Sequence, residues 1–178
     1  MQPHILLEEI FTSLKVGRTI PKHPYRYVNL ATSVDNKIFQ RMVVFRKIEK
    51  NCITIYTDSR TPKVSQLKSN SNASLLFWDY KRMTQIQLQG KVAINLEKDT
   101  SIWNNLPEKA KEDYSATKVP GSELSSSNEI QFFEEENFFC KLQFHITEID
   151  YLKINKPHHI RAKFTLENEQ WEGNYVVP

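Results

Sequence analysis

The spacing of apolar residues predicts one helix at the start of the chain. Residues 4–19 carry apolar side chains at intervals that place them on one helical face. These residues are Ile5, Leu6, Ile10 and Leu14. Gly17 is expected to end this helix, because glycine is typical of helix C-termini.

From residue 25 onward the pattern becomes that of strands. In residues 25–34, Val28 and Leu30 share one face, and residues 34–37 supply turn-forming side chains. The run 73–80 is continuously apolar, which is typical of a strand covered on both faces. Further β-rich runs cover residues 41–48, 51–57, 84–94, 139–152, 161–167 and 171–177.

The clearest alternation lies in residues 84–94, where apolar Ile86 and Leu88 alternate with glutamines. We expect one buried face and one face that carries Gln85, Gln87 and Gln89. A short helix is expected at 62–70, two helical pieces separated by Pro107 at 97–116, and a mobile loop at 118–130.

Many short strands with few helices indicate a mainly β fold. We expect an antiparallel β-barrel of six to eight strands with peripheral helices, because closure removes exposed strand edges. A length of 178 residues suits one domain, residues 1–178.

Composition excludes several classes of protein. Apolar residues make up 39% and charged residues 25% of the chain, which argues against disorder or a fibrous repeat. Without a membrane-length apolar run or a signal pattern, we expect a soluble cytoplasmic protein with no membrane partner. The net charge of +3 is dispersed, so no nucleic-acid partner is expected. Cys52 and Cys140 lack ligand spacing, so we expect buried thiols and no metal site.

The segment "YTDSRTPKVSQL", residues 56–67, is the first candidate for chemistry. Pro62 suits the first position of a helix, and Thr61 suits its N-cap. A cation in the first turn, Lys63, is unfavourable next to the positive end of the helix dipole. An anion such as phosphate, shared by Lys63, Arg60 and the helix N-terminus, would remove this conflict. The alternative is a solvated Lys63, at a cost of about 0.3–1 kcal/mol.

Other polar residues at strand starts are open to two interpretations. Arg41 could bind the same phosphate through its planar donor fork, or end a strand in solvent. Gln85 could bind the edge of a heterocycle through its amide, or be solvated. Arg161 is more typical of an exposed cation, and Tyr151 and Trp171 are more typical of core aromatics.

Residues 41–92 resemble the N-terminal half of the pyridoxamine 5'-phosphate oxidase-like family, which are flavoproteins with the FMN-binding split-barrel fold. Residues 149–171, "IDYLKINKPHHIRAKFTLENEQW", are similar to the C-terminal segment of that family. The segment "TDSRTPK", residues 57–63, resembles the uncharacterised FMN-binding branch of this family more closely than the true vitamin B6 oxidases. The resemblance implies FMN as the cofactor and a homodimer with the cofactor site at the subunit interface.

The resemblance also implies roles for individual residues. Arg41 and Lys63 would hold the FMN phosphate, with Arg60 or the Pro62 backbone beside it. Residues expected along the cofactor are Met42, Val43 and Val44, with Tyr56 and Thr57 at the phosphate or ribityl side. Gln85 would address the isoalloxazine, and Tyr151 and Arg161 would approach the ring from the partner subunit.

For the substrate, the resemblance leaves only Arg46 and His159 as candidates. Most of the clamp that binds a pyridoxyl phosphate in the B6 oxidases is missing, so that activity is not expected. We expect an FMN-dependent oxidoreductase acting on an unidentified small molecule. The alternative is a non-catalytic flavin- or haem-binding protein, with His145, His158 or His159 as axial ligand.

Overall fold

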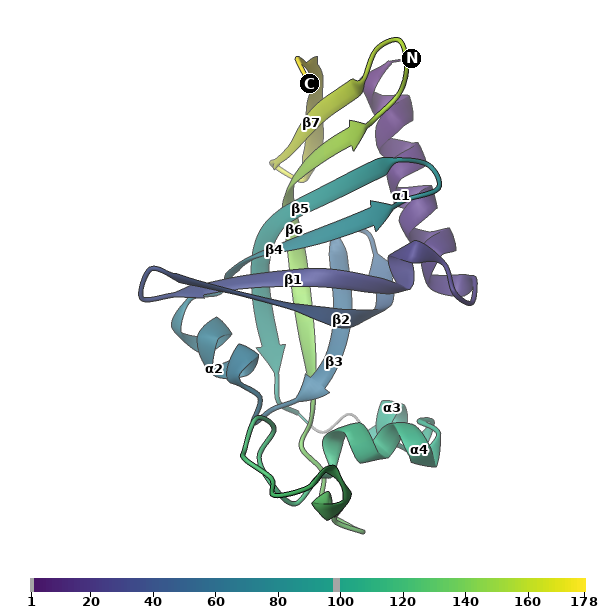
Figure 1. The fold of residues 1–178 in the computed structure, drawn as a ribbon. Helices are drawn as coiled ribbons and strands as arrows, with labels where there is room; N and C mark the ends of the chain where they lie inside the picture. The colour runs from purple at the N-terminus through teal and green to yellow at the C-terminus, as the bar shows by residue number, and fades with distance from the viewer. Residues whose placement is uncertain (1, 98–99) are drawn as a thin grey trace.

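The computed structural model describes residues 2–97 and 100–178, and Figure 1 shows their arrangement. The strands are β1 (Tyr27–Val34), β2 (Lys37–Glu49), β3 (Cys52–Asp58), β4 (Asn72–Asp79), β5 (Thr84–Asn95), β6 (Phe139–Lys153), β7 (Ile160–Glu167) and β8 (Gln170–Val176). The helices are α1 (Pro3–Thr19), α2 (Pro62–Ser69), α3 (Thr100–Asn104) and α4 (Glu108–Lys111), with 3₁₀ turns at Pro24–Arg26, Glu112–Tyr114 and Ser127–Glu129.

All eight strands form one antiparallel sheet that closes on itself. The order is β3-β2-β1-β4-β5-β6-β7-β8, and β3 also pairs with β6. Six strands therefore make a barrel, while β7 and β8 extend from it as a flange beside α1 (Figure 1). This confirms the expected mainly β fold with peripheral helices.

Strand β2 pairs with β3 over only part of its length. Asp35 and Asn36 both have positive φ, and they form the tight turn that joins β1 to β2. Residues Lys37 to Val44 of β2 pair with β1, whereas the register with β3 begins only at Phe45, opposite Ile55. The end of β3, Tyr56–Asp58, pairs instead with β6. Helix α2 follows this end of β3 and contacts β1 and β5.

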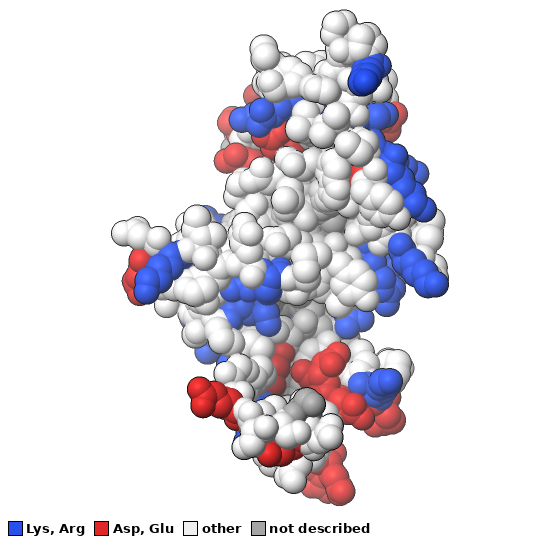
Figure 2. All heavy atoms as spheres, viewed as in Figure 1, with Lys and Arg blue, Asp and Glu red and all other residues white. Residues whose placement is uncertain are grey.

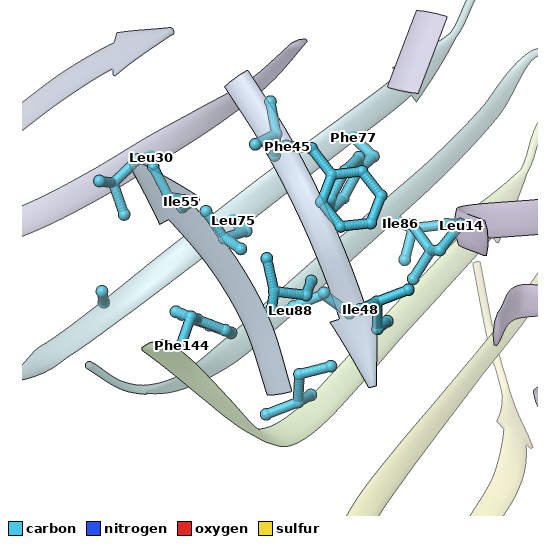
Figure 3. Packing of buried hydrophobic residues seen from close by; sticks show 14 of the residues in the cluster. Leu14, Leu30, Phe45, Ile48, Ile55, Leu75, Phe77, Ile86, Leu88 and Phe144 are labelled. Atoms are coloured by element: carbon cyan, nitrogen blue, oxygen red, sulfur yellow. The ribbon is translucent and has the colours of Figure 1, made fainter. Parts of the chain in front are cut away.

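Side chains from the barrel strands and α1 fill the interior. Figure 3 shows Phe45, Phe77, Ile86 and Leu14 packed together near one end of this core. In α1, Ile10 and Leu14 are buried as expected, but Ile5 is 42% exposed. The helix continues through Gly17 to Thr19, so the expected end at Gly17 is wrong.

The reason for Gly17 is a close approach. A Cβ atom at this position would lie 2.7 Å from Cβ of Tyr25, which is buried. Glycine thus lets the chain fold back against the helix. Because Tyr25 lies in the 3₁₀ turn, the strand expected at 25–34 starts only at Tyr27.

Strand β4 differs from its expected environment. Ala73, Leu75 and Phe77 are buried, but Leu76 and Trp78 are each 39% exposed on the opposite face. The prediction that β4 is covered on both faces is therefore wrong for the single chain. The alternation expected for β5 is confirmed, because Ile86 and Leu88 are buried.

The connection between β5 and β6 forms a separate layer below the barrel (Figure 1). We call residues 100–138 the excursion. Helices α3 and α4 lie on either side of the break at Pro107, as expected, and residues 118–130 are loop with one 3₁₀ turn. Figure 2 shows acidic side chains gathered over the excursion, at the bottom of the view.

No helix among the described residues is long and apolar enough to cross a bilayer.

Candidate functional site

The turn from β3 into α2 has the predicted backbone. Thr61 is extended and Pro62 occupies the first helical position. The Thr61 hydroxyl, however, donates to the carbonyl oxygen of Asp58 at 2.8 Å and makes no capping hydrogen bond to α2. The expected side-chain cap is therefore wrong, because the tight turn brings the Asp58 carbonyl within reach of the hydroxyl.

Lys63 points back toward the end of β3. Its Nζ donates to Oγ1 of Thr57 at 2.8 Å, and Thr57 is buried. Burial, followed by the neighbouring charge of Arg41, lowers the pKa of Lys63, while Asp58 acts in the opposite direction. The ammonium is therefore a partly desolvated charge.

Arg41 lies on the interior side of β2, between β1 and α2. Its Nη1 donates to Oγ1 of Thr32 at 2.7 Å and to the carbonyl oxygen of Leu30 at 3.3 Å. Its Nη2 donates to Oε1 of Gln66 at 2.7 Å, and Thr32 donates to the same oxygen at 2.7 Å. Burial lowers the pKa of Arg41. Thr32 and Gln66 therefore fix the direction of the guanidinium.

These residues form what we call the cradle. Its members are Thr32, Arg41, Thr57, Lys63 and Gln66. Within residues 2–97 and 100–178, neither cation forms an ion pair with a carboxylate. Two half-buried positive charges near the start of a helix favour an anion between them, since it would offset both charges. The donors of the cradle are of the chemical kind that binds phosphate.

Arg60 is placed differently from the other two cations. Its Nε and Nη2 donate to the two carboxylate oxygens of Asp58 at 3.1 and 2.7 Å. Nη2 also donates to the carbonyl oxygen of Ala116 at 2.7 Å, and the guanidinium lies 3.3 Å from the centre of the Phe138 ring. The structure thus joins Arg60 to the excursion, and a direct phosphate contact by Arg60 stays a prediction.

The three residues after Arg41 face in alternate directions. Met42 is 59% exposed on the outer side of the sheet, Val43 is buried in the core and Val44 is half-buried on the outer side. The register places Met42 beside Asn29 and Asn29 beside Leu76. Tyr27, Met42, Leu76 and Trp78 are therefore exposed apolar residues around Asn29 on one side of the sheet, which we call the outer face.

Gln85 and Arg161 also lie on this side of the sheet. Gln85 pairs with Trp78 and Leu152, and Leu152 pairs with Arg161, so the four strands β4 to β7 present these residues in one row. Arg161 makes a two-point ion pair with Asp150 at 3.0 and 2.7 Å.

Tyr151 does not join this row. It pairs with the buried Ile86 and lies on the interior side of β6, packed against the core under α1. Burial raises the pKa of its hydroxyl, and a hydrogen bond with Thr84 acts in the opposite direction. The structure thus agrees with the core interpretation of Tyr151, and its expected contact across a dimer stays a prediction.

The two substrate candidates lie in different surroundings. Arg46 stacks over the Tyr56 ring at 5.5 Å and its Nε is buried without a hydrogen-bond partner among the described residues. Tyr56 in turn packs against Phe139 at 5.0 Å between ring centres. His159 is exposed in the β6–β7 loop, with Nδ1 3.1 Å from the backbone nitrogen and oxygen of Asn155. In the part of the chain that the structure describes, no hydrogen bond, ion pair or ring contact joins Arg46 and His159.

Sequence reasoning missed Thr32, Gln66 and Asp58. A hydroxyl on the apolar side of β1 and an amide on the buried side of α2 were the available signals for the first two. Asp58, which is 2% exposed on its side chain, was indicated only by its place at the strand end.

Comparisons with known proteins show similarity of sequence and of fold. Residues 9–95 match the model of the family described as pyridoxamine 5'-phosphate oxidase, FMN-binding domain. No curated protein matches the chain by sequence.

Three solved structures illustrate the shared fold. A pyridoxamine 5'-phosphate oxidase-related, FMN-binding protein from Nostoc punctiforme is 21% identical, with a TM-score of 0.80 and complete cover of both chains. PhzG from Burkholderia lata, in complex with tetrahydrophenazine-1-carboxylic acid, is 17% identical, with a TM-score of 0.77 over 98% of this chain and 92% of that one. General stress protein 26 from Bacillus anthracis is 17% identical, with a TM-score of 0.56 over 87% and 98% of the two chains.

The family match covers the strands and the helix that build the cradle, and the fold similarity extends over the rest of the chain. The resemblance seen in the sequence is confirmed. Residues 9–95, just under half of the chain, therefore resemble the FMN-binding domain of the pyridoxamine 5'-phosphate oxidase family.

Proposed function

We propose that this chain binds FMN, with the phosphate in the cradle. The observation that carries the proposal is the pair of half-buried cations, Arg41 and Lys63, without a carboxylate partner among the described residues. A phosphate monoester carries a charge of about −1.5 to −2 at neutral pH, enough to offset both. Thr57 can accept from Lys63 and also donate its own proton to a phosphate oxygen.

We further propose that the chain acts as a homodimer that shares the cofactor between subunits. The outer face is apolar and exposed, and contiguous apolar surface of this kind favours association. Met42 lies on the outer face one residue from Arg41, and Gln85 and Arg161 occupy the same side of the sheet. A two-fold contact through this side would bring Gln85 of one subunit and Arg161 of the other toward a common site.

The proposed activity is oxidation or reduction of a small molecule. FMN supplies the redox chemistry when bound, and the chain supplies anchoring and orientation. Arg161, paired with Asp150, would offer guanidinium hydrogen-bond donors to the ring, and Gln85 an amide that can donate and accept hydrogen bonds. Pyridoxamine 5'-phosphate is disfavoured as substrate. Arg46 packs against Tyr56, and the resemblance implies that Pro157 replaces the arginine of the oxidases' arginine-histidine pair, of which only His159 is kept.

We place the protein in the cytoplasm and treat residues 1–178 as one domain. Both cysteines are free thiols, as is usual in a reducing compartment. All eight strands belong to one sheet, which supports one folding unit.

The test is a flavin titration of purified apoprotein, followed by sedimentation and by addition of NADH or NADPH. We expect one FMN per chain, yellow holoprotein, a raised melting temperature and a dimer. Colourless protein whose melting temperature does not change with saturating FMN would contradict the proposal. Bound FMN that neither nucleotide reduces would favour the non-catalytic flavin-binding alternative.

A further inference from the structure

A buried carboxylate lies next to the cradle. Asp58 directly follows Thr57, and its side chain is 2% exposed. One carboxylate oxygen accepts from the backbone nitrogen of Arg60 at 2.8 Å and from its Nε at 3.1 Å, and the other accepts from Nη2 at 2.7 Å. In this described part of the chain, Arg60 is therefore the cation that neutralises Asp58.

Without that neutralisation, the carboxylate would oppose phosphate binding. Asp58 already acts on Lys63 electrostatically, since it partly restores the pKa that burial depresses. Lys63 lies at 2.8 Å from the hydroxyl of the adjacent Thr57. An unpaired carboxylate on the residue next to Thr57 would attract Lys63 and repel a phosphate, and both effects are strong where water is excluded.

Arg60 is held in place from the side opposite to the turn. Its Nη2 donates to the carbonyl oxygen of Ala116, and its guanidinium stacks on the ring of Phe138. The backbone of Phe138 is itself tied to the turn, because Ser59 donates to its carbonyl oxygen at 2.8 Å. The excursion therefore keeps the guanidinium on Asp58.

We propose that Arg60 is a positioning residue that acts on the bound phosphate through Asp58, and so makes the site prefer phosphorylated flavin over riboflavin. This inference rests on the proposed binding of FMN. It differs from the expectation of a direct phosphate contact, because the effect of Arg60 would vanish once Asp58 carries no charge.

The experiment measures dissociation constants for FMN and for riboflavin, which lacks the phosphate, in four proteins. These are the wild type, Arg60→Gln, Arg60→Lys and the double variant Asp58→Asn with Arg60→Gln. Circular dichroism checks that each variant folds. The ratio of the riboflavin to the FMN dissociation constant isolates the contribution of the phosphate, because a general loss of structure weakens both ligands alike.

We expect Arg60→Gln to weaken FMN by about tenfold and to leave riboflavin unchanged, in line with the coupling between neighbouring charged groups. The double variant should recover most of the wild-type ratio, since it removes the carboxylate together with the cation. Arg60→Lys, which keeps the charge, should lie close to the wild type.

Three results would overturn the inference. They are an unchanged ratio in Arg60→Gln, an equal loss for both flavins, and a double variant as weak as the single one, which would indicate direct phosphate contact. A wild type that binds no FMN would instead refute the proposed function itself. If Arg60→Gln does not fold, the double variant and Arg60→Lys still test the inference. A ratio of the riboflavin to the FMN dissociation constant that is well below the wild-type ratio in the double variant would contradict it.

Discussion

Replacement of Lys63 by methionine separates the contribution of this residue to the stability of the apoprotein from its contribution to FMN affinity. In the apoprotein the ammonium is partly desolvated and close to Arg41, and both effects lower its pKa. Methionine keeps most of the length of the side chain and removes the charge. The substitution loses the charged hydrogen bond to Thr57, worth about 1.5–3 kcal/mol, and relieves an unfavourable buried charge, which offsets most of that loss. The free energy of unfolding of the apoprotein should therefore change by less than about 1 kcal/mol.

The effect on FMN should be much larger. A hydrogen bond from a charged donor to phosphate is worth about 1.5–3 kcal/mol, so the dissociation constant should rise roughly 10- to 150-fold. Riboflavin affinity should not change. Flavin fluorescence titration measures the affinity, and thermal melting of the apoprotein with and without saturating FMN measures the stability. The matched control is Lys68→Met, which removes an exposed lysine from the same helix.

The pH dependence gives a second test of the same residue. The pKa of Lys63 is lowered from 10.5 in the folded chain. At a pH between the folded-state pKa and 10.5, this lysine therefore binds fewer protons in the folded chain than in the unfolded chain. The stability of the wild-type apoprotein should therefore gain a contribution from Lys63 as pH rises through this window, and Lys63→Met should lack it. Unchanged FMN affinity in Lys63→Met, or an equal loss in Lys68→Met, would refute the assignment of Lys63 to the phosphate.

Three further predictions concern the strands. Gly90→Ala should destabilise the protein by about 1–3 kcal/mol in urea unfolding, because the new Cβ would lie 2.1 Å from the carbonyl oxygen of His145; unaltered stability would show that β5 and β6 can separate there. Trp78→Ser should shift the protein from dimer to monomer in sedimentation velocity, whereas Val177→Ser, an exposed control, should not; a dimeric Trp78→Ser would argue against the outer face as the interface. Burial raises the pKa of Cys140 to about 11, so iodoacetamide at pH 8 should spare this thiol until the protein unfolds, and rapid labelling of the native protein would contradict its burial.

The sequence predicted those elements whose pattern is decided by the core. Residues 84–94 alternate because only one face of β5 meets the interior, and Ile86 and Leu88 are buried there. The run 73–80 misled, because its second apolar face is exposed in the single chain. An apolar pattern shows that a face avoids water, but it does not show what covers that face. Gly17 misled for a related reason, since its role depends on the close approach of Tyr25.

The sequence predicts those parts of the candidate site that depend on residues close together in the chain. The order of Thr57, Pro62 and Lys63 follows from a strand end and a helix start. Arg41 was a candidate because of its planar donor fork, and the resemblance favoured its phosphate role over a solvated strand end. The partners that hold Arg41 were not found, because Thr32 and Gln66 meet it only after β1, β2 and α2 pack together. Likewise, the contacts of Arg60 with Ala116 and Phe138 join segments far apart in the chain.

Strand β6 has a consequence for the order of events during synthesis. It is the last strand of the barrel to leave the ribosome, and its pairing of His145 with Cys52 joins distant parts of the chain. At a synthesis rate of about 5–20 residues per second, the edge of β3 that pairs with β6 stays unpaired for several seconds before β6 emerges. Such long-range pairing is slow, and a bare edge invites pairing with other chains. A nascent chain that stalls before Phe139 would hold both cradle cations yet have no closed ring, and it would be prone to aggregate.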